Sequence, residues 1–264
     1  MQAREEGEEW RPNTPFAGTA SDDRAGGTKL TAIHLMISRR KLLLGSGMGT
    51  LAALAHSARA QDAGQWFAIK GDDGKPVPNL RLPVEVTSEL DELGGVIWTG
   101  ADERVLTLVE FFDYNCPYCR AAMRDIHGLL QETPDLRLGL VNNPILSADS
   151  ADAARVELAV LRLGGPERAY EFHRRLFERR GRIGRDKALD VAASLGAPVA
   201  DVARLADAPD IQGVLADQMR LAASLGMAAT PSFLIAGAGL LGYPGPVSLK
   251  EIVGSVRDCG QITC

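Results

Sequence analysis

Hydrophobic positions along the chain predict a buried strand that leads directly into an amphipathic helix. Residues 105–114 are almost continuously apolar and rich in β-branched and aromatic side chains, a pattern typical of a strand buried on both faces. Beyond this strand, apolar side chains recur at the helical spacing i, i+4, i+7 and i+11, namely Cys119, Met123, Ile126 and Leu130. We therefore expect a central strand followed, after a short turn, by a helix with one buried face.

A long stretch of helical periodicity separates two groups of predicted strands. A second strand is predicted at 136–142, and from about 148 to 226 the apolar residues follow helical spacing without a strand pattern. Breaks that contain Gly or Pro divide this stretch into four or five helices: Gly164-Gly165-Pro166, Gly196-Ala197-Pro198 and Ala208-Pro209-Asp210. Further strands are predicted at 232–236 and 239–241, and a final helix at 248–257.

This order of elements predicts an α/β chain with a thioredoxin-like fold. A βαβ unit and a ββα unit form the frame, and an α-helical domain is inserted between them at about 148–226. We expect this domain to cover residues 101–264. Residues 61–100 carry only weak strand signals, and we treat them as an N-terminal extension without an assigned role.

Residues 36–60 have the pattern of a signal peptide. A basic start precedes an apolar run from Leu42 to Ala55, which is too short to span a bilayer, and a small-x-small cleavage site ends at Ala60. The pair Arg39-Arg40 resembles a twin-arginine export signal, with an ordinary secretory signal as the alternative. Cleavage after Ala60 would release the mature protein into the periplasm.

Residues 1–35 are acidic near their start and show no periodic apolar pattern, which is typical of disorder. A start codon assigned too far upstream is the alternative, with Met36 as the better start.

Composition limits the classes of partner. The chain has 264 residues, of which 45% are hydrophobic and 24% charged, as in ordinary globular proteins. Its formal net charge is −5, and Lys and Arg form no dense block. Nucleic acids need clustered positive charge, so we predict no nucleic-acid partner.

The motif Cys116-Pro117-Tyr118-Cys119 stands at the predicted start of the helix. Pro117 suits the first helical position, where a missing N–H group costs nothing. The helix dipole and the free N–H groups of the first turn would stabilise a thiolate at Cys116. Cys119 lies near enough to close a disulfide and to release a partner held by Cys116. We therefore assign Cys116 as the nucleophile and Cys119 as the resolving thiol.

A zinc site is the alternative interpretation of these cysteines. Zinc needs four ligands, and the remaining pair, Cys259 and Cys264, has a spacing that zinc sites do not use. We therefore predict no metal and no cofactor. We expect Cys259 and Cys264 to form a structural disulfide, with a second redox pair as the alternative.

Three segments resemble the DsbA-like family of thioredoxin-fold thiol-disulfide oxidoreductases: residues 109–119, 143–146 and 229–233. The resemblance covers roughly residues 104–264 and implies catalysis of dithiol-disulfide exchange. It also implies that Pro231 is a cis-proline packed against the cysteine pair. Together with Thr230, Pro117 and Tyr118, this proline would bind the substrate.

Glu110 interrupts the apolar strand and shares a face with Leu106, Leu108 and Phe112. A similar acidic residue in thioredoxin-like proteins implies that Glu110 relays protons to Cys119. A solvated glutamate on an edge strand is the alternative.

The resemblance also implies the partners of the protein. These are cysteine-containing exported proteins and a membrane redox partner that recycles the Cys116/Cys119 pair. Thr230 before Pro231 resembles the disulfide-isomerase and copper-tolerance branches, so oxidase, reductase and isomerase all stay open. Residues 61–100 look too short for the dimerisation domain of those isomerases, and we expect a monomer. A Cu(I)-handling or chaperone protein that uses the same thiolates is the alternative function.

Overall fold

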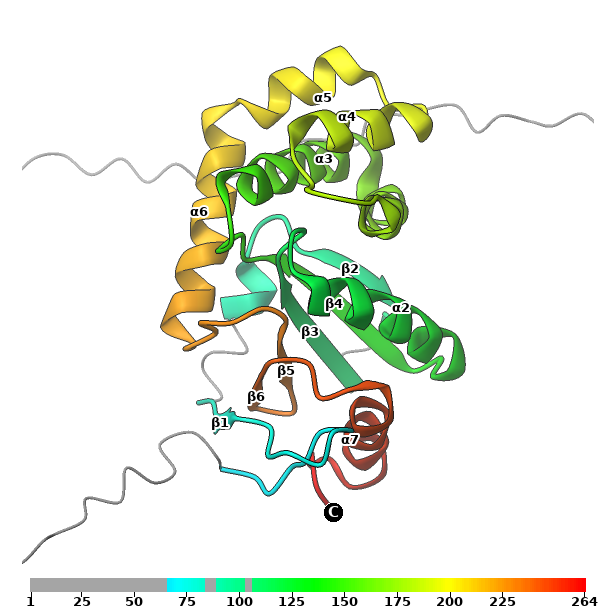
Figure 1. The fold of residues 1–264 in the computed structure, drawn as a ribbon, viewed down its shortest axis with the longest axis vertical. Coiled ribbons are helices and arrows are strands. Elements are labelled where there is room, and N and C mark those ends of the chain that lie inside the picture. Colours follow the sequence, from blue (N-terminus) through cyan, green and yellow to red (C-terminus); the bar gives the residue numbers. More distant parts are fainter. Residues whose placement is uncertain (1–65, 84–88, 103–105) are drawn as a thin grey trace, which may run out of the picture. The chain divides into compact units, whose positions relative to one another are not determined.

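The computed structural model describes residues 66–83, 89–102 and 106–264. The segment 1–35 and the predicted signal peptide at 36–60 lie outside the described residues. Figure 1 shows the arrangement of the described helices and strands.

One mixed sheet forms the frame of the described part of the chain, with the strand order β1-β6-β5-β3-β4-β2. Strand β3 (Leu106–Phe112) pairs in parallel with β4 (Leu136–Asn142) and antiparallel with β5 (Ser232–Ile235). Strand β6 (Ala238–Leu241) continues the sheet antiparallel to β5. The predicted central position of the first apolar strand is confirmed, because β3 is hydrogen-bonded on both sides.

The segment 61–100 supplies both edges of the sheet. Strand β1 (Asn79–Arg81) pairs antiparallel with β6, and β2 (Ile97–Gly100) pairs antiparallel with β4. Each of these strands is short and has a partner on one side only, which explains why its hydrophobic pattern is weak.

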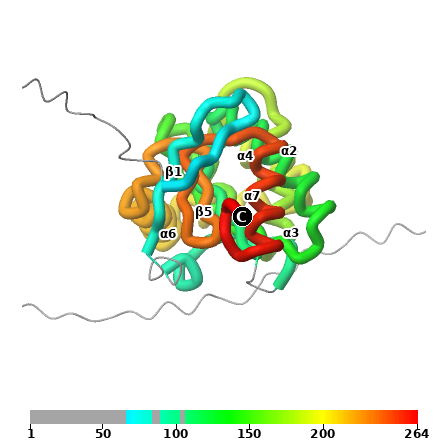
Figure 2. Tube along the Cα trace, turned by 90° about the horizontal axis from the view of Figure 1, so that it is seen from below, coloured from blue at the N-terminus to red at the C-terminus, as the bar shows by residue number. Residues whose placement is uncertain are grey.

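The same segment also contacts the C-terminal helix α7 (Pro246–Cys259). The side chain of Asp72 accepts hydrogen bonds from the backbone N–H groups of Val247 (3.0 Å) and Ser248 (2.8 Å). These donors belong to the first turn of α7, where backbone N–H groups have no partner within the helix. Figure 2 shows β1 and α7 at the same end of the described structure.

The predicted helical insertion is confirmed. It consists of α3 (Ala148–Glu178), α4 (Arg185–Ser194), α5 (Val199–Ala206) and α6 (Pro209–Ser224). Helix α3 is broken at Gly165, which has φ 79° and is followed by proline, so the Gly-Gly-Pro break acts as predicted. Figure 1 shows α3, α4 and α5 beyond one end of the sheet, with α6 running along its side. None of the described helices is long and apolar enough to cross a membrane.

Helices cover both faces of the central strand. Leu106, Leu108 and Phe112 lie in one hydrophobic cluster with residues of α7 and of α2 (Pro117–Glu132). Val109 and Phe111 point to the other face and lie in a second cluster with residues of α6. This alternation is the period of two that a strand imposes on its side chains.

The buried face of α2 differs slightly from the predicted stripe. Cys119, Met123 and Ile126 are buried as predicted, but Leu129 rather than Leu130 completes the stripe. The buried face is wider than the predicted line of residues and also includes Ala122. Leu130 is partly buried and packs against the core.

A glycine in β4 makes room for an aromatic ring. Gly139 faces Trp98 of β2, and a Cβ atom at position 139 would lie 2.5 Å from the nearest atom of the Trp98 ring. The guanidinium carbon of Arg137 lies 3.7 Å from the centroid of the same ring. The Trp98 indole therefore packs the edge strand β2 against β4, and only glycine at position 139 leaves room for the ring.

We predict that Gly139→Ala lowers the free energy of unfolding by about 1 to 3 kcal/mol, because the ring must shift to admit the methyl group. Gly128→Ala in α2 is the matched control, since nothing lies within 4 Å of its Cβ position. The control should gain up to about 1 kcal/mol from the helix propensity of alanine. Chemical denaturation measures both values, and equal stability of the two variants would contradict this account of Gly139.

Candidate active site

The turn between β3 and α2 is built around the buried side chain of Asp113. Its carboxyl oxygens accept hydrogen bonds from the backbone N–H groups of Asn115 (2.7 Å) and Leu146 (2.8 Å). Its carbonyl oxygen accepts a further hydrogen bond from the N–H group of Cys116 at 3.0 Å. These contacts fix the backbone directly before the cysteine pair.

Cys116 is the N-cap residue of α2, and Pro117 follows it in the first turn. The pKa of the Cys116 thiol is lowered to about 6, first by the hydrogen bond from the side chain of Cys119. Burial opposes this shift, whereas the N–H groups of Cys119 and Tyr118 and the side chain of Thr230 lower the pKa further. Hydrogen bonds that reach the sulfur favour its charged form. Cys116 therefore carries a thiolate at neutral pH.

Cys119 lies one helical turn further on and is completely buried. Burial raises the pKa of its thiol far above the ordinary value, and its hydrogen bond to Cys116 acts in the same direction. The negative charges of Glu110 and Cys116 raise this pKa further. Both active-site cysteines are free thiols. Their acidities are thus opposed in the sense that a nucleophile and a resolving thiol require.

The loop before β5 approaches the reactive sulfur. In the thiol form, Cys116 donates a hydrogen bond from Sγ to the backbone oxygen of Thr230 at 3.0 Å. The peptide bond between Thr230 and Pro231 is cis, which confirms that prediction. Pro117 is exposed and Tyr118 is 66% exposed, so both side chains can meet a partner that approaches Cys116.

Glu110 is 1% exposed, and neither of its carboxyl oxygens has a hydrogen-bond partner. Burial raises the pKa of this carboxyl to about 8, with a smaller contribution from the charge of Cys116. The alternative of a solvated glutamate on an edge strand is wrong, because β3 is paired on both sides.

Cys259 and Cys264 are joined by a disulfide, as predicted for this pair. Cys259 is the last residue of α7, so it faces the negative end of the helix dipole. This end does not stabilise a thiolate, which disfavours the alternative of a second redox pair. The described part of the chain holds no group of three or more His, Cys, Asp or Glu side chains that could bind a metal.

Sequence reasoning missed the contact that ties the cysteine turn to the insertion. The Nδ2 group of Asn115 donates to the backbone oxygen of Ile183 at 2.8 Å, and the Ile183 N–H group donates to Oδ1 of Asn115 at 2.8 Å. Ile183 lies in the loop between α3 and α4. The two residues are 68 positions apart, and no local pattern signals their pairing.

Sequence reasoning also missed a buried polar cluster between the sheet and the insertion. Glu157 of α3 accepts hydrogen bonds from the Tyr114 hydroxyl and from Asn142 Nδ2, the latter at 2.7 Å. His173 Nδ1 lies 3.2 Å from the same carboxyl group, and its ring packs edge-on against Phe112. Burial, followed by the charge of Glu157, raises the pKa of Tyr114 well above its ordinary value. A glutamate between the apolar residues of α3 was the one available signal.

Known proteins share this fold. The family model of the DSBA-like thioredoxin domain matches residues 107–255. A thioredoxin-like oxidoreductase from Silicibacter pomeroyi DSS-3 is 33% identical, with a TM-score of 0.53, and the match covers 69% of this chain and 93% of that one.

Two further structures are similar. The catalytic domain of Proteus mirabilis ScsC is 25% identical, with a TM-score of 0.57, and the match covers 64% of this chain and 95% of that one. The thiol-disulfide exchange protein α-DsbA2 from Wolbachia pipientis shares the fold at 23% identity and a TM-score of 0.59, over 65% of this chain and 94% of that one. No curated protein sequence matches the chain. Because the family model matches more than half of its residues, the chain belongs to the DsbA-like thioredoxin domain family of thiol-disulfide oxidoreductases.

Proposed function

We propose that the protein exchanges disulfides with cysteine-containing exported proteins in the bacterial periplasm. The observation that carries this proposal is the opposed acidity of the two thiols. The pKa of Cys116 is lowered to about 6 at the N-terminus of α2, whereas that of the buried Cys119 is raised. One sulfur is therefore ready to attack, and the other stays protonated until it is needed.

Reduction of a substrate disulfide proceeds in two steps. The Cys116 thiolate attacks one substrate sulfur, the substrate S–S bond breaks, and the other substrate sulfur leaves as a thiolate that takes up a proton. Cys119 then loses its proton and attacks Cys116 Sγ, which releases the first substrate sulfur and leaves a Cys116–Cys119 disulfide. Two electrons pass from the enzyme to the substrate.

Oxidation of a substrate dithiol is the reverse of these steps and consumes the Cys116–Cys119 disulfide. A membrane redox partner would then restore the pair. The reduction potential of the pair decides the direction. Pro117 and Tyr118 provide no histidine to stabilise the thiolate further, so we infer a less extreme oxidant than DsbA itself.

Glu110 is proposed to accept the proton of Cys119 in the second step. Its charge acts on the pKa of Cys119, and its carboxyl group has no hydrogen-bond partner that would compete for the proton. With a pKa of about 8 the carboxyl group is mostly protonated at neutral pH, so the proton acceptor would be its ionised form, about a tenth of the molecules at pH 7.

The substrate is proposed to bind as an extended segment between the Thr230-Pro231 loop and the exposed residues Pro117 and Tyr118. This placement is supported by the 3.0 Å distance from Cys116 Sγ to the Thr230 backbone oxygen. A substrate strand can pair with backbone groups of this loop while its sulfur meets Cys116.

The periplasmic location rests on the predicted signal peptide at 36–60, cleaved after Ala60. The disulfide between Cys259 and Cys264 fits an oxidising compartment, where we propose that it staples the C-terminal tail to α7. A monomer is supported by the segment 61–100, whose strands β1 and β2 belong to the sheet rather than to a separate domain.

We predict that alkylation of the reduced protein by iodoacetamide modifies Cys116 first. The rate should rise through a midpoint near pH 6 and level off above it, because the thiolate is the reacting species. Mass spectrometry of the digested protein identifies the modified cysteine. Labelling of Cys119 before Cys116, or a midpoint near that of a free thiol, would reverse the assigned roles.

We predict that Cys119→Ser accumulates mixed disulfides with exported proteins. Serine keeps a hydroxyl donor beside Cys116, so the first attack continues while the resolving step is lost. Periplasmic extracts resolved on non-reducing gels should show adducts that a reductant removes. Cys116→Ser is the control and should show none; a normally folded Cys119→Ser protein without adducts would oppose dithiol exchange.

We predict that Glu110→Gln slows resolution of a preformed mixed disulfide by on the order of 100-fold, because the proton acceptor for Cys119 is removed. Alkylation of Cys116 should change much less, because Glu110 is still protonated and uncharged when Cys116 titrates near pH 6. Quenched-flow kinetics measures the resolving step. An unchanged rate would assign Glu110 no part in proton transfer.

The same substitution should flatten the dependence of stability on pH in the oxidised protein, in which neither active-site thiol titrates. Burial still raises the pKa of Glu110 in the oxidised protein, although the charge of Cys116 no longer contributes, so above pH 4.5 unfolded Glu110 is ionised while folded Glu110 keeps its proton until its own raised pKa is reached. The native state thus binds more protons, and its stability falls as pH rises, by up to about 1.4 kcal/mol per pH unit. Glu110→Gln removes this slope, and denaturation at several pH values measures it.

A further inference from the structure

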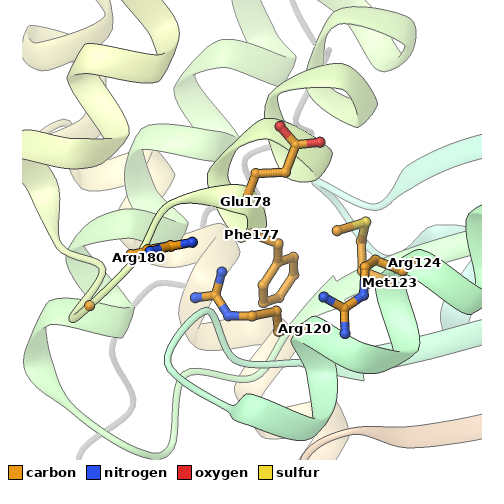
Figure 3. Close-up of a pocket in the computed structure, with 7 residues that line it drawn as sticks. Arg120, Met123, Arg124, Phe177, Glu178 and Arg180 are labelled. Carbon is orange, nitrogen blue, oxygen red and sulfur yellow. The ribbon is translucent and has the colours of Figure 1, made fainter.

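A pocket of about 440 Å³ lies between α2 and the loop that follows α3. Its floor is apolar, because Phe177 and Met123 are both buried. Figure 3 shows the guanidinium groups of Arg120, Arg124 and Arg180 around the Phe177 ring. Glu178 also lines the pocket, but its carboxyl group points away from the three arginines. The pocket therefore combines an apolar floor with a positively charged rim.

The positive charge of this rim is not neutralised by the described residues. No carboxylate of residues 66–83, 89–102 or 106–264 forms an ion pair with Arg120, Arg124 or Arg180. Arg120 instead donates to the backbone oxygen of Arg179 at 2.8 Å. The pKa of Arg120 is lowered, first by burial and then by the charge of Arg124. The guanidinium groups thus repel each other, in a chain whose formal net charge is −5.

Neighbouring arginines of the insertion are paired with carboxylates. Arg174 and Arg175 both contact Glu171, and Arg185 contacts Asp207 with two hydrogen bonds of 2.8 and 2.9 Å. Such pairing is the usual state of an arginine near acidic residues. At the pocket, Arg120, Arg124 and Arg180 lack this pairing within the described part of the chain.

The pocket begins one helical turn from the reactive sulfur. Cys116, Arg120 and Arg124 follow each other at a spacing of four residues, which places them along one face of α2. The opposite wall is the loop that carries Arg180 and Ile183. The two 2.8 Å hydrogen bonds between Ile183 and Asn115 hold this loop against the residue before Cys116. The position of the pocket relative to the sulfur is therefore fixed by the fold.

We propose that this pocket binds an acidic side chain of the substrate polypeptide and so favours cysteines that have Asp or Glu nearby in the sequence. A guanidinium group pairs with a carboxylate through two parallel hydrogen bonds, and the apolar floor receives the methylene groups of Glu. Two turns of α2 span about 11 Å, or roughly three residues of extended chain. The favoured carboxylate thus stands about two to four residues from the reacting cysteine.

This inference rests on the proposed function, and two measurements separate them. The first is binding of a labelled peptide in which serine replaces the reacting cysteine and Glu stands three residues away, compared with a peptide that carries Gln at that position. The second is the rate of disulfide exchange with the cysteine-containing forms of both peptides. Binding tests the pocket, and exchange tests the enzyme.

We expect the wild-type protein to bind the Glu peptide about tenfold more tightly than the Gln peptide at low salt. This preference should fade as added salt shortens the Debye length from about 30 Å to about 3 Å. The double variant Arg124→Gln/Arg180→Gln should lose the preference, and Arg124→Lys/Arg180→Lys should recover part of it. Both positions are exposed, so these substitutions leave the core intact.

Arg220→Gln is the matched control, because it removes a positive charge from the exposed surface of α6, far along the chain from the pocket. It should keep the full preference for Glu. Equal binding of the two peptides by the wild-type protein, or a preference that survives in Arg124→Gln/Arg180→Gln, would overturn the inference. If both peptides exchange disulfides at equal rates and bind equally, the proposed function is supported and the inference about the pocket is overturned. If the Glu peptide binds more tightly but neither peptide exchanges, only the proposed function is overturned.

Discussion

Glu157 brings a carboxyl group from the helical insertion to the end of the sheet, where Tyr114 and Asn142 both donate hydrogen bonds to it. All three side chains are at most 1% exposed, so removing one partner would leave buried polar groups unsatisfied. Tyr114 stands two residues before Cys116, and Asn142 ends β4. This cluster joins the insertion to the sheet directly before the cysteine turn, and the hydrogen bonds between Asn115 and Ile183 add a second connection there.

A second buried carboxyl group, unlike that of Glu157, has no hydrogen-bond partner. Glu110 lies on the central strand without a hydrogen-bond partner, and the fold keeps it there although its pKa is raised to about 8. Glu157 contributes to the stability of the fold because its carboxyl oxygens accept hydrogen bonds, whereas Glu110 lowers the stability because its buried carboxyl oxygens accept none. Buried polar groups that the fold leaves unsatisfied are candidates for proton transfer, and Cys119 is the neighbouring group that must lose a proton.

Local patterns predicted the frame of the molecule well. The strand at 136–142 has the predicted bounds, and the break at Gly165 falls inside the predicted Gly-Gly-Pro segment. Strands β1 and β2 gave only weak strand signals, because an edge strand of three or four residues has too few positions to show a period. The burial of Leu129 in place of Leu130 has another cause. The width of the buried face of a helix depends on the elements that pack over it, and residue spacing along the chain carries no information about those elements.

The features of the active site likewise divide into those set by local sequence and those set by long-range contacts. The low pKa of Cys116 follows first from the hydrogen bond of the Cys119 side chain and then from N–H groups of the first turn, both of which the Cys-x-x-Cys spacing places at a helix N-terminus. Cys119 is buried because helical spacing turns it inward. Arg180 lies 56 positions after Arg124, and the two line one pocket where the loop after α3 is held by long-range hydrogen bonds such as those between Asn115 and Ile183. The acidities of the two thiols are therefore encoded largely by local sequence, whereas the pocket that we propose to select the substrate depends on long-range contacts of the insertion. An inserted domain can then alter selectivity while the Cys-Pro-Tyr-Cys turn and its acidities stay the same.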